Sequence, residues 1–364
     1  LLINYSNFMK KHNFSAGPCI LPKEVLLKAS EAVINFNNEN LSLIEISHRS
    51  KPFIEVMQKA KDLVKELLNV PEGYSILFLQ GGASLEFLMT PYNLLSLNGT
   101  CGYINTGTWS TKAIKEAKSI GKTYVIADSS DKKFNYIPKK IVINEDLDYL
   151  HYTSNNTIYG TQFKDYPKTN SILVCDMSSD IFSKKVDISK FGLIYAGAQK
   201  NMGPAGTTLV IVKNDILGKT GRKIPTMLDY NTHINKDSMY NTPPVFPIYV
   251  SMLTLEWLKE KGGIEYIEKV NNKKAFELYK EIDRNVFFKG LVDKEDRSNM
   301  NITFSLKDNK LENEFDLLCK SYGINGLKGH RSVGGYRASL YNALPLESVE
   351  VLINVMQNLE TNNK

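Results

Sequence analysis

The amino-acid sequence predicts an α/β protein with a large domain, built on a mostly parallel sheet between helices, and a smaller α+β domain at the C-terminal end. The chain has 364 residues, of which 42% are hydrophobic and 23% charged, so it can bury a sizeable core. Short apolar runs alternate with helical patterns along most of the chain, and this alternation changes after about Met252. These observations predict the two-part architecture.

The strand candidates are short, and several are apolar throughout, which is typical of parallel strands covered on both faces. They span residues 75–79, 102–105, 123–127, 149–152, 172–175, 193–196 and 208–212. The segments between them have the patterns of helices and turns. We therefore expect a mostly parallel sheet with helices on both sides.

Two helices are expected before the first strand. Residues 22–36 carry a proline in the first turn and apolar side chains on one face. A second apolar stripe follows Ser50, whose side chain can cap the helix, and it ends at the polar turn 71–73. A Lys-rich helix that begins near Thr108 is expected to reach Lys118.

The C-terminal part has a different order of elements, which indicates a smaller α+β unit. Its expected elements are a helix over 253–261, an amphipathic helix after Gly263, an alternating strand over 300–306, a further helix, a glycine turn at 334–335 and a terminal helix.

We divide the chain into three parts on this basis. The large domain covers residues 21–260 and the small domain covers 261–364, while the N-terminal segment 1–20 joins the small domain. Residues 1–8 are expected to be disordered or extraneous, and Met9 is a plausible native start.

Composition limits the classes of partner. The formal net charge is +6 with lysines spread along the chain, which favours acidic metabolites over nucleic acid. The four cysteines lie far apart, so we expect free, mostly buried thiols in a reducing compartment. No stretch resembles a membrane span or a signal peptide. The sequence therefore predicts a cytoplasmic protein with no nucleic-acid, membrane or metal partner.

Lys200 is the most informative residue of the sequence. It follows the apolar run 193–196, stands among alanine, glycine and glutamine, and is followed shortly by a Gly-Pro-Ala-Gly turn. Burial with few counter-charges would lower the pKa of its amine, as Schiff-base formation with a carbonyl cofactor requires. Asp176 ends the preceding apolar run and could keep a ring nitrogen of such a cofactor protonated. Two plainer interpretations stay open, a solvated surface lysine and an aspartate that caps a helix.

A glycine turn at residues 80–84 (Gln-Gly-Gly-Ala-Ser) lies between a predicted strand and a predicted helix. Such a turn leaves backbone N–H groups free at a helix N-terminus, where they can bind phosphate. The signal is weak by itself, because neither a Walker A motif nor GxGxxG accompanies it. Trp109 is expected either in the core or stacked on a flat cofactor.

Together these segments resemble the phosphoserine aminotransferases, a family among the class V aminotransferases of fold-type I. The resemblance spans residues 14–346. Its motifs are residues 13–18, 46–50, 80–84, 175–179, 195–206, 241–244 and 329–339. It implies a seven-stranded sheet and pyridoxal 5′-phosphate bound as a Schiff base on the catalytic Lys200. One departure is Ala83-Ser84, where some members carry Gly-Arg and use the arginine for phosphate.

The resemblance also implies a role for each residue around the cofactor. Asp176 would pair with the ring nitrogen, Trp109 would stack on the ring and Thr157 would donate near the phenolic oxygen. Asn241 and Thr242 would reach the phosphate from the neighbouring subunit of a homodimer with shared active sites. The full implied cofactor set is Ala83, Ser84, Trp109, Thr157, Asp176, Gln199, Lys200, Asn241 and Thr242.

The implied substrates carry two or more negative charges, which guanidinium groups bind well. Arg337 is the candidate for the α-carboxylate. Candidates for the side-chain carboxylate or the phosphate, some of them from the partner subunit, are His48, Arg49, His330 and Arg331. The plainer interpretation of each arginine is a surface salt bridge that contributes little.

The implied activity is a reversible ping-pong transfer of the amino group of L-glutamate to 3-phosphohydroxypyruvate, giving O-phospho-L-serine and 2-oxoglutarate. Members of the family also handle the phosphohydroxythreonine analogue of pyridoxine biosynthesis, and the sequence leaves this open. The alternatives are a serine–glyoxylate aminotransferase, a cysteine desulfurase, a non-catalytic cofactor-binding protein and a nucleotide-binding module. A desulfurase needs a cysteine nucleophile on a mobile loop, which neither Cys19 nor Cys319 provides.

Overall fold

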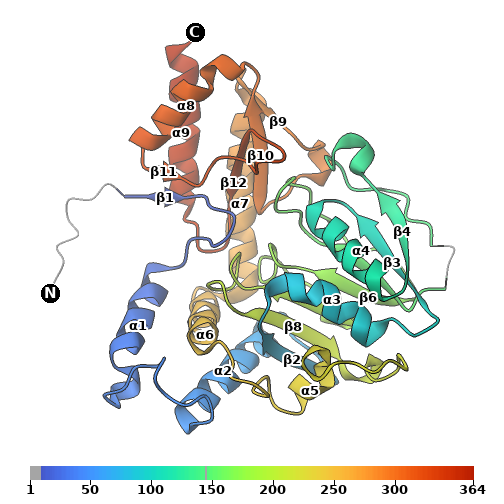
Figure 1. Ribbon diagram of the computed structural model, residues 1–364. Coiled ribbons are helices and arrows are strands. Elements are labelled where there is room, and N and C mark those ends of the chain that lie inside the picture. The colour runs from blue at the N-terminus through green and yellow to red at the C-terminus, as the bar shows by residue number, and fades with distance from the viewer. Residues whose placement is uncertain (1–9, 144–145) are drawn as a thin grey trace.

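The computed structural model describes residues 10–143 and 146–364, so the expectations for residues 1–8 and Met9 lie outside it. The strands of the large sheet are β2 (Tyr74–Leu79), β3 (Thr100–Asn105), β4 (Lys122–Asp128), β5 (Tyr149–Thr153), β6 (Ile172–Asp176), β7 (Leu193–Gly197) and β8 (Thr208–Lys213). They form one seven-stranded sheet in the order β2-β8-β7-β6-β5-β3-β4 (Figure 1). Only β8 is antiparallel to its neighbours. The predicted mostly parallel sheet is confirmed.

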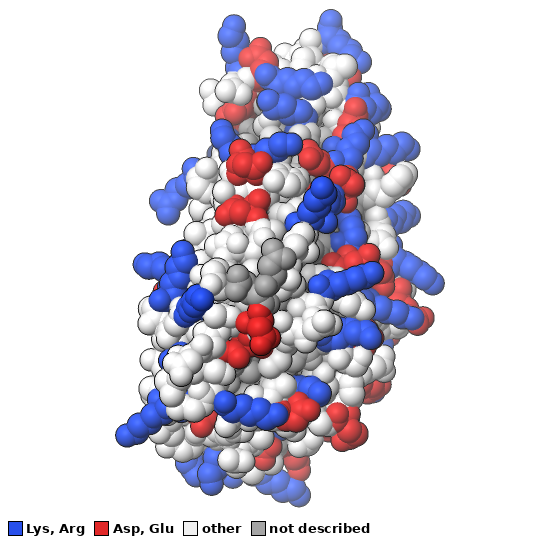
Figure 2. All heavy atoms as spheres, turned by 90° about the vertical axis from the view of Figure 1, so that its right-hand side faces the viewer, with Lys and Arg blue, Asp and Glu red and all other residues white. Residues whose placement is uncertain are grey.

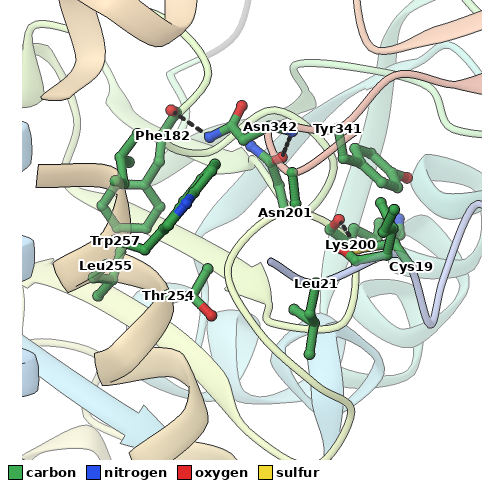
Figure 3. Close-up of a pocket in the computed structure, with 13 residues that line it drawn as sticks. Cys19, Leu21, Phe182, Lys200, Asn201, Thr254, Leu255, Trp257, Tyr341 and Asn342 are labelled. Carbon is green, nitrogen blue, oxygen red and sulfur yellow. Dashed lines mark hydrogen bonds between the residues drawn. The ribbon is translucent and has the colours of Figure 1, made fainter. Parts of the chain in front are cut away.

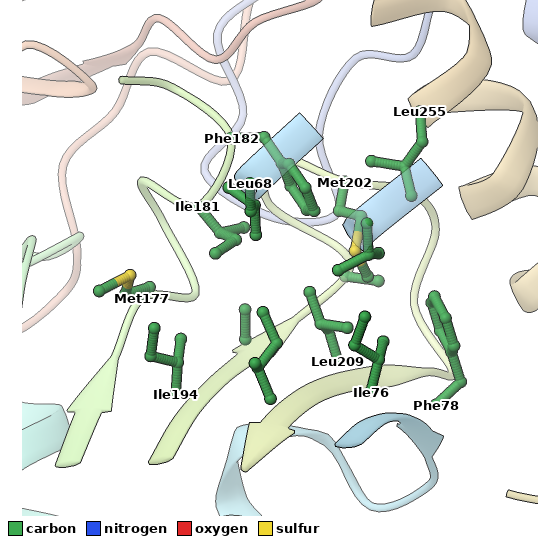
Figure 4. Close-up of a cluster of buried hydrophobic side chains, with 14 of the residues drawn as sticks. Leu68, Ile76, Phe78, Met177, Ile181, Phe182, Ile194, Met202, Leu209 and Leu255 are labelled. Atoms are coloured by element: carbon green, nitrogen blue, oxygen red, sulfur yellow. The ribbon is translucent and has the colours of Figure 1, made fainter. Parts of the chain in front are cut away.

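Helices cover both faces of this sheet. The helices that contribute to its two buried layers are α1 (Lys23–Ile34), α2 (Lys51–Leu68) and α6 (Val245–Glu260) on one face, and α3 (Gly82–Leu94), α4 (Thr108–Ile120) and α5 (Tyr230–Ile234) on the other. Figure 4 shows part of the first layer, where Ile76 and Leu209 of the sheet lie in the same cluster as Leu255 of α6. Because both faces are covered, every residue of β7 is buried, which explains its continuous apolar run.

The smaller unit has its own sheet and core. Its elements are α7 (Gly263–Arg284), β9 (Phe288–Gly290), β10 (Asn301–Leu306), α8 (Glu312–Ser321), β11 (Ile324–Asn325), β12 (Tyr336–Ser339) and α9 (Leu346–Asn362). Strands β12, β10 and β9 form an antiparallel sheet. The N-terminal strand β1 (His12–Asn13) pairs with β11, and Phe14 is buried in this unit's core. The boundaries near residues 20 and 260 stay a prediction.

The expected capping of the second helix is wrong. Ser50 does precede α2, but its hydroxyl donates to the carbonyl oxygen of Ser47 (2.7 Å) and makes no bond to the helix. The helix expected over 253–261 also starts earlier, at Val245. It begins directly after Pro244, because proline fits ahead of a helix or in its first turn and breaks a helix further along.

The strand expected over 300–306 exists as β10, but its exposure does not alternate. All of its residues except Ser305 are buried. β10 is the middle strand of its sheet, and its second face meets the large unit, where Thr303 donates a hydrogen bond to the Tyr159 carbonyl (2.9 Å). A strand covered on both faces loses the alternation that a half-exposed strand shows.

No helix in the described residues is long and apolar enough to cross a membrane. Within residues 10–143 and 146–364, no group of three His, Cys, Asp or Glu side chains could hold a metal ion. All four cysteines are free thiols and only Cys19 is partly exposed, as predicted. On the face shown in Figure 2, Lys and Arg side chains are interspersed with Asp and Glu, so the net positive charge is not gathered there.

Candidate active site

Lys200 and Asp176 lie at the same edge of the large sheet. Asp176 is the last residue of β6, and Lys200 follows the end of the adjacent parallel strand β7. Lys200 is 8% exposed and Asp176 is 3% exposed. The interpretation of Lys200 as a solvated surface lysine is therefore wrong.

The surroundings of Lys200 favour a neutral amine. Burial lowers the pKa of Lys200 to about 8, with the Arg337 charge acting in the same direction and the Asp176 carboxylate opposing it. The Lys200 Nζ donates a hydrogen bond to Thr157 Oγ1 (2.8 Å). Near neutral pH the site thus holds an amine that can lose its proton readily, as a nucleophile or a base must.

Asp176 is held by a serine turn. Its Oδ1 accepts hydrogen bonds from the N–H (2.9 Å) and hydroxyl (2.6 Å) of Ser178, and Ser178 Oγ in turn accepts from the N–H of Gly197 (3.1 Å). No helix begins here, so the helix-cap alternative for Asp176 is wrong. In the described residues, the hydrogen bonds that Ser178 donates to Asp176 both end on Oδ1, so Oδ2 is the oxygen that can face a ligand.

The glycine turn forms the start of α3. Gly81 has a φ of 92°, and a Cβ there would lie 2.6 Å from the side chain of Leu85, so only glycine fits. Ala83 and Ser84 lie in the first turn of α3, where backbone N–H groups have no acceptor within the helix. This end of α3 can therefore accept an anion.

Residues 241–242 lie beside that turn in the same chain. The Asn241 amide donates to Gln80 Oε1 (3.2 Å), and the Gln80 amide donates to the Thr242 carbonyl oxygen (2.8 Å). Gln80 therefore fixes the loop next to the glycine turn. The reach of Asn241 and Thr242 into a partner's site stays a prediction.

Trp109 stands at the beginning of α4 and faces the lysine. Its ring centroid lies 5.1 Å from Lys200 Nζ, and its Nε1 is buried without a hydrogen-bond partner in the described part of the chain. A tryptophan that served only as core would pack against apolar groups. Here the ring borders a polar site, as stacking on a flat ligand requires.

The predicted anion-binding motif 329–339 lies at the border of this site. Arg337, on β12, donates from Nη1 to the Thr157 carbonyl (3.1 Å), and its Nε is buried without a partner among the described residues. His330 lies in an exposed turn, where partial burial and then the charges of Arg337, Arg331 and Lys112 lower its pKa. The site is therefore bordered by several positive groups.

The segment 48–49 behaves differently. Arg49 is exposed, and its N–H donates to Ser47 Oγ (3.2 Å) within its own turn. Among the described residues, His48 Nε2 is buried without a hydrogen-bond partner. No hydrogen bond or ion pair of the described chain joins either side chain to Lys200, so the structure does not bring them to this chain's own site.

Sequence reasoning assigned no role to the N-terminal stretch that supports the lysine. The Cys19 thiol donates to the Lys200 carbonyl (2.7 Å), and a Cβ at Gly17 (φ 144°) would lie 3.3 Å from Lys200 Cγ. Asn201 accepts a hydrogen bond from the N–H of Asn342 (2.8 Å) in the smaller unit (Figure 3). Both parts of the chain therefore fix the backbone around Lys200. Motif 13–18 was the signal that could have revealed the first of these contacts.

Residues 11–352 match the family described as aminotransferase class-V. Over 353 residues the chain is 64% identical to the phosphoserine aminotransferase of Flavobacterium psychrophilum, covering 97% of this chain and 99% of that protein. This chain belongs to the phosphoserine aminotransferase family. The predicted family is confirmed.

Solved structures of phosphoserine aminotransferases have the same fold as this chain. A phosphoserine aminotransferase from Bacillus circulans subsp. alkalophilus has a TM-score of 0.94 at 45% identity, covering 98% of this chain and 99% of that chain. One from Trichomonas vaginalis, solved with PLP bound, has a TM-score of 0.90 at 36% identity, covering 96% and 100%. The predicted fold-type I architecture is confirmed, and a nucleotide-binding module is not supported.

Proposed function

We propose that this aminotransferase moves the amino group of L-glutamate to 3-phosphohydroxypyruvate by a ping-pong route, with pyridoxal 5′-phosphate as cofactor. The observation that carries the proposal is Lys200, a buried amine with a pKa of about 8 beside Asp176 and the ring of Trp109. The products are O-phospho-L-serine and 2-oxoglutarate. The free thiols suit the reducing cytoplasm, where we place the reaction.

Several groups at the site fit this cofactor. Trp109 Nε1 and Arg337 Nε are buried polar atoms that lack a partner in the described chain, and such atoms usually face a ligand or water. The free N–H groups at the start of α3 suit a phosphate ester. When bound, the cofactor supplies an electron sink and carries the amino group between the two half-reactions. The residues that would hold it in this chain are Ala83, Ser84, Trp109, Thr157, Asp176, Gln199 and Lys200.

Side chains of this chain transfer the proton and bind the substrate. Lys200 would take the proton from the α-carbon of the amino donor and return it to the carbon on the other side of the donor's nitrogen, which its pKa of about 8 suits. Arg337 binds the α-carboxylate, since its guanidinium is half-buried and anchored to the Thr157 carbonyl. Burial of Lys200 and Asp176 keeps water away from both groups.

A cysteine desulfurase is less consistent with the site. The cysteine that contacts Lys200 is Cys19, whose pKa burial raises to about 12. Burial also raises the pKa of Cys319 to about 12. A thiol with so high a pKa is protonated at neutral pH and is a poor nucleophile.

We propose a homodimer in which residues 48–49 and 241–242 complete the partner's site. Ile44, near the first segment, is 61% exposed, and Tyr240, beside the second, is 44% exposed. Exposed apolar side chains next to polar functional groups suit an interface. Light scattering should give the mass of two chains. The mass of one chain under assay conditions would contradict shared sites.

The substrate proposal predicts the two halves of the reaction separately. Glutamate added to the loaded enzyme should bleach its visible absorbance, and phosphohydroxypyruvate should restore it. Hydroxypyruvate lacks the phosphate and should restore the absorbance at least about tenfold less efficiently, because charged hydrogen bonds to phosphate are lost. Stopped-flow absorbance measures both steps. An equal response to the two keto acids would contradict the phosphate-specific function.

The pKa of Lys200 predicts how cofactor loading depends on pH. Only the neutral amine attacks an aldehyde, so the second-order rate of loading the apoenzyme should rise with pH, about tenfold per unit below pH 8. Above a pKa of about 8 the rate should level off. Rapid mixing of apoenzyme and cofactor at constant ionic strength measures this profile. A rate that keeps rising to pH 10 would show an unperturbed lysine.

A further inference from the structure

Lys112 lies one helical turn after Trp109 on α4 and has no place in the roles described so far. Its Nζ lies 4.9 Å from the centroid of the Trp109 ring. The same ring centroid lies 5.1 Å from Lys200 Nζ. Lys112 and Lys200 therefore both contact the ring of Trp109. A cation held over an aromatic ring samples fewer positions than a free lysine.

The charge of Lys112 has no counter-charge within the described residues. Lys112 is exposed and forms no ion pair or hydrogen bond in the part of the chain that the structure describes. Burial and the charges of Arg337, Arg331 and Lys112 lower the pKa of His330. Positive groups repel one another, so the grouping of Arg337, Arg331 and Lys112 around His330 is typical of a site that receives an anion.

We propose that Lys112 binds the phosphate of the phosphorylated keto acid and so helps this enzyme to distinguish a phosphate from a carboxylate. This inference rests on the proposed function and adds a specificity residue to it. Arg337 is the half-buried group near Thr157 and suits the α-carboxylate, which both substrates share. Lys112 is exposed on α4. We assign it to the other end of the substrate, where one substrate has a phosphate and the other a carboxylate.

Charge explains why a lysine here would discriminate. A phosphate monoester carries close to two negative charges at neutral pH, whereas the side-chain carboxylate of glutamate carries one. A lysine ammonium acts as a point charge, so its attraction grows with the charge of the ligand rather than with the match of a planar fork. Removing Lys112 should therefore weaken the binding of the phosphorylated ligand more than the binding of the dicarboxylate.

Binding to the holoenzyme tests this without turnover. The probes are 3-phosphoglycerate, which resembles the keto acid but has a hydroxyl in place of the keto group, and glutarate, which resembles glutamate but has no amine. Calorimetry should show that Lys112→Met raises the Kd of 3-phosphoglycerate about three- to tenfold, with a smaller change for glutarate. Lys112→Arg should restore most of the affinity. Lys118→Met, which removes the same charge near the other end of α4, should leave both Kd values within about twofold.

The kinetic counterpart is the ratio of kcat/KM for phosphohydroxypyruvate and glutamate, which should fall in Lys112→Met by a similar factor. If both probes lose affinity equally and the visible spectrum of the cofactor shifts, Lys112 only supports Trp109 and the inference is wrong. An unchanged Kd for 3-phosphoglycerate overturns it as well. Failure of the parent enzyme to aminate phosphohydroxypyruvate would instead contradict the proposed function.

Discussion

Lys200→Ala is expected to abolish amino transfer, with a loss of roughly a thousandfold or more, because it removes both a nucleophile and an acid–base group. Two observations make this lysine irreplaceable. It is buried, and its Nζ is fixed on Thr157 Oγ1 at 2.8 Å beside the ring of Trp109. An alanine at this position has neither an amine that can attack a carbonyl nor a group that can carry the proton. Single-turnover absorbance with glutamate measures the loss.

Lys200→Ala also tests whether the cofactor is attached covalently to Lys200. Borohydride reduction of the parent enzyme should fix the cofactor on Lys200, and peptide mapping should find the added mass there. Lys274 is an internal control, since it is also buried but donates its three hydrogen bonds to the carbonyl groups of Leu340, Tyr341 and Leu344. Label on Lys274, or undiminished label in Lys200→Ala, would show that the site has been assigned wrongly.

The sequence predicted the sheet and its central pair of residues because both depend on local pattern. The apolar runs 172–175 and 193–196 coincide with β6 and β7, and parallel neighbours place their carboxyl ends together. That topology is enough to bring Asp176 near Lys200. The glycine turn at 80–84 is local as well, since Gly81 needs a positive φ.

The rest of the site depends on contacts between segments that lie far apart in the sequence. Nothing in a helical pattern shows that Lys112 stands over Trp109, or that Cys19 donates to the carbonyl of Lys200. The position of Arg337 follows from β12, a strand too short and mixed to be expected. Residues 48–49 show a further limit, because no hydrogen bond or ion pair of the described chain joins either side chain to Lys200, and their role stays a prediction.

Asp176→Asn is expected to lower kcat by roughly a hundred- to thousandfold, the range typical of removing one electrostatic contact in a buried site. Asparagine keeps the shape and can still accept the hydrogen bonds that Ser178 donates to Oδ1. It cannot supply the negative charge that would keep a proton on the ring nitrogen of the cofactor. Presteady-state rates with glutamate, combined with the Kd of the cofactor, measure the effect.

Ser178→Ala provides the matched comparison. It leaves the Asp176 charge but removes the hydroxyl that bridges Asp176 Oδ1 to the N–H of Gly197. Since that hydroxyl only orients the carboxylate, its loss should cost about tenfold or less in kcat. A larger loss in Ser178→Ala than in Asp176→Asn would mean that the end of β7, and not the charge of Asp176, limits the reaction. A smaller loss of kcat in Ser178→Ala than in Asp176→Asn would show that the negative charge of Asp176 is what the reaction requires.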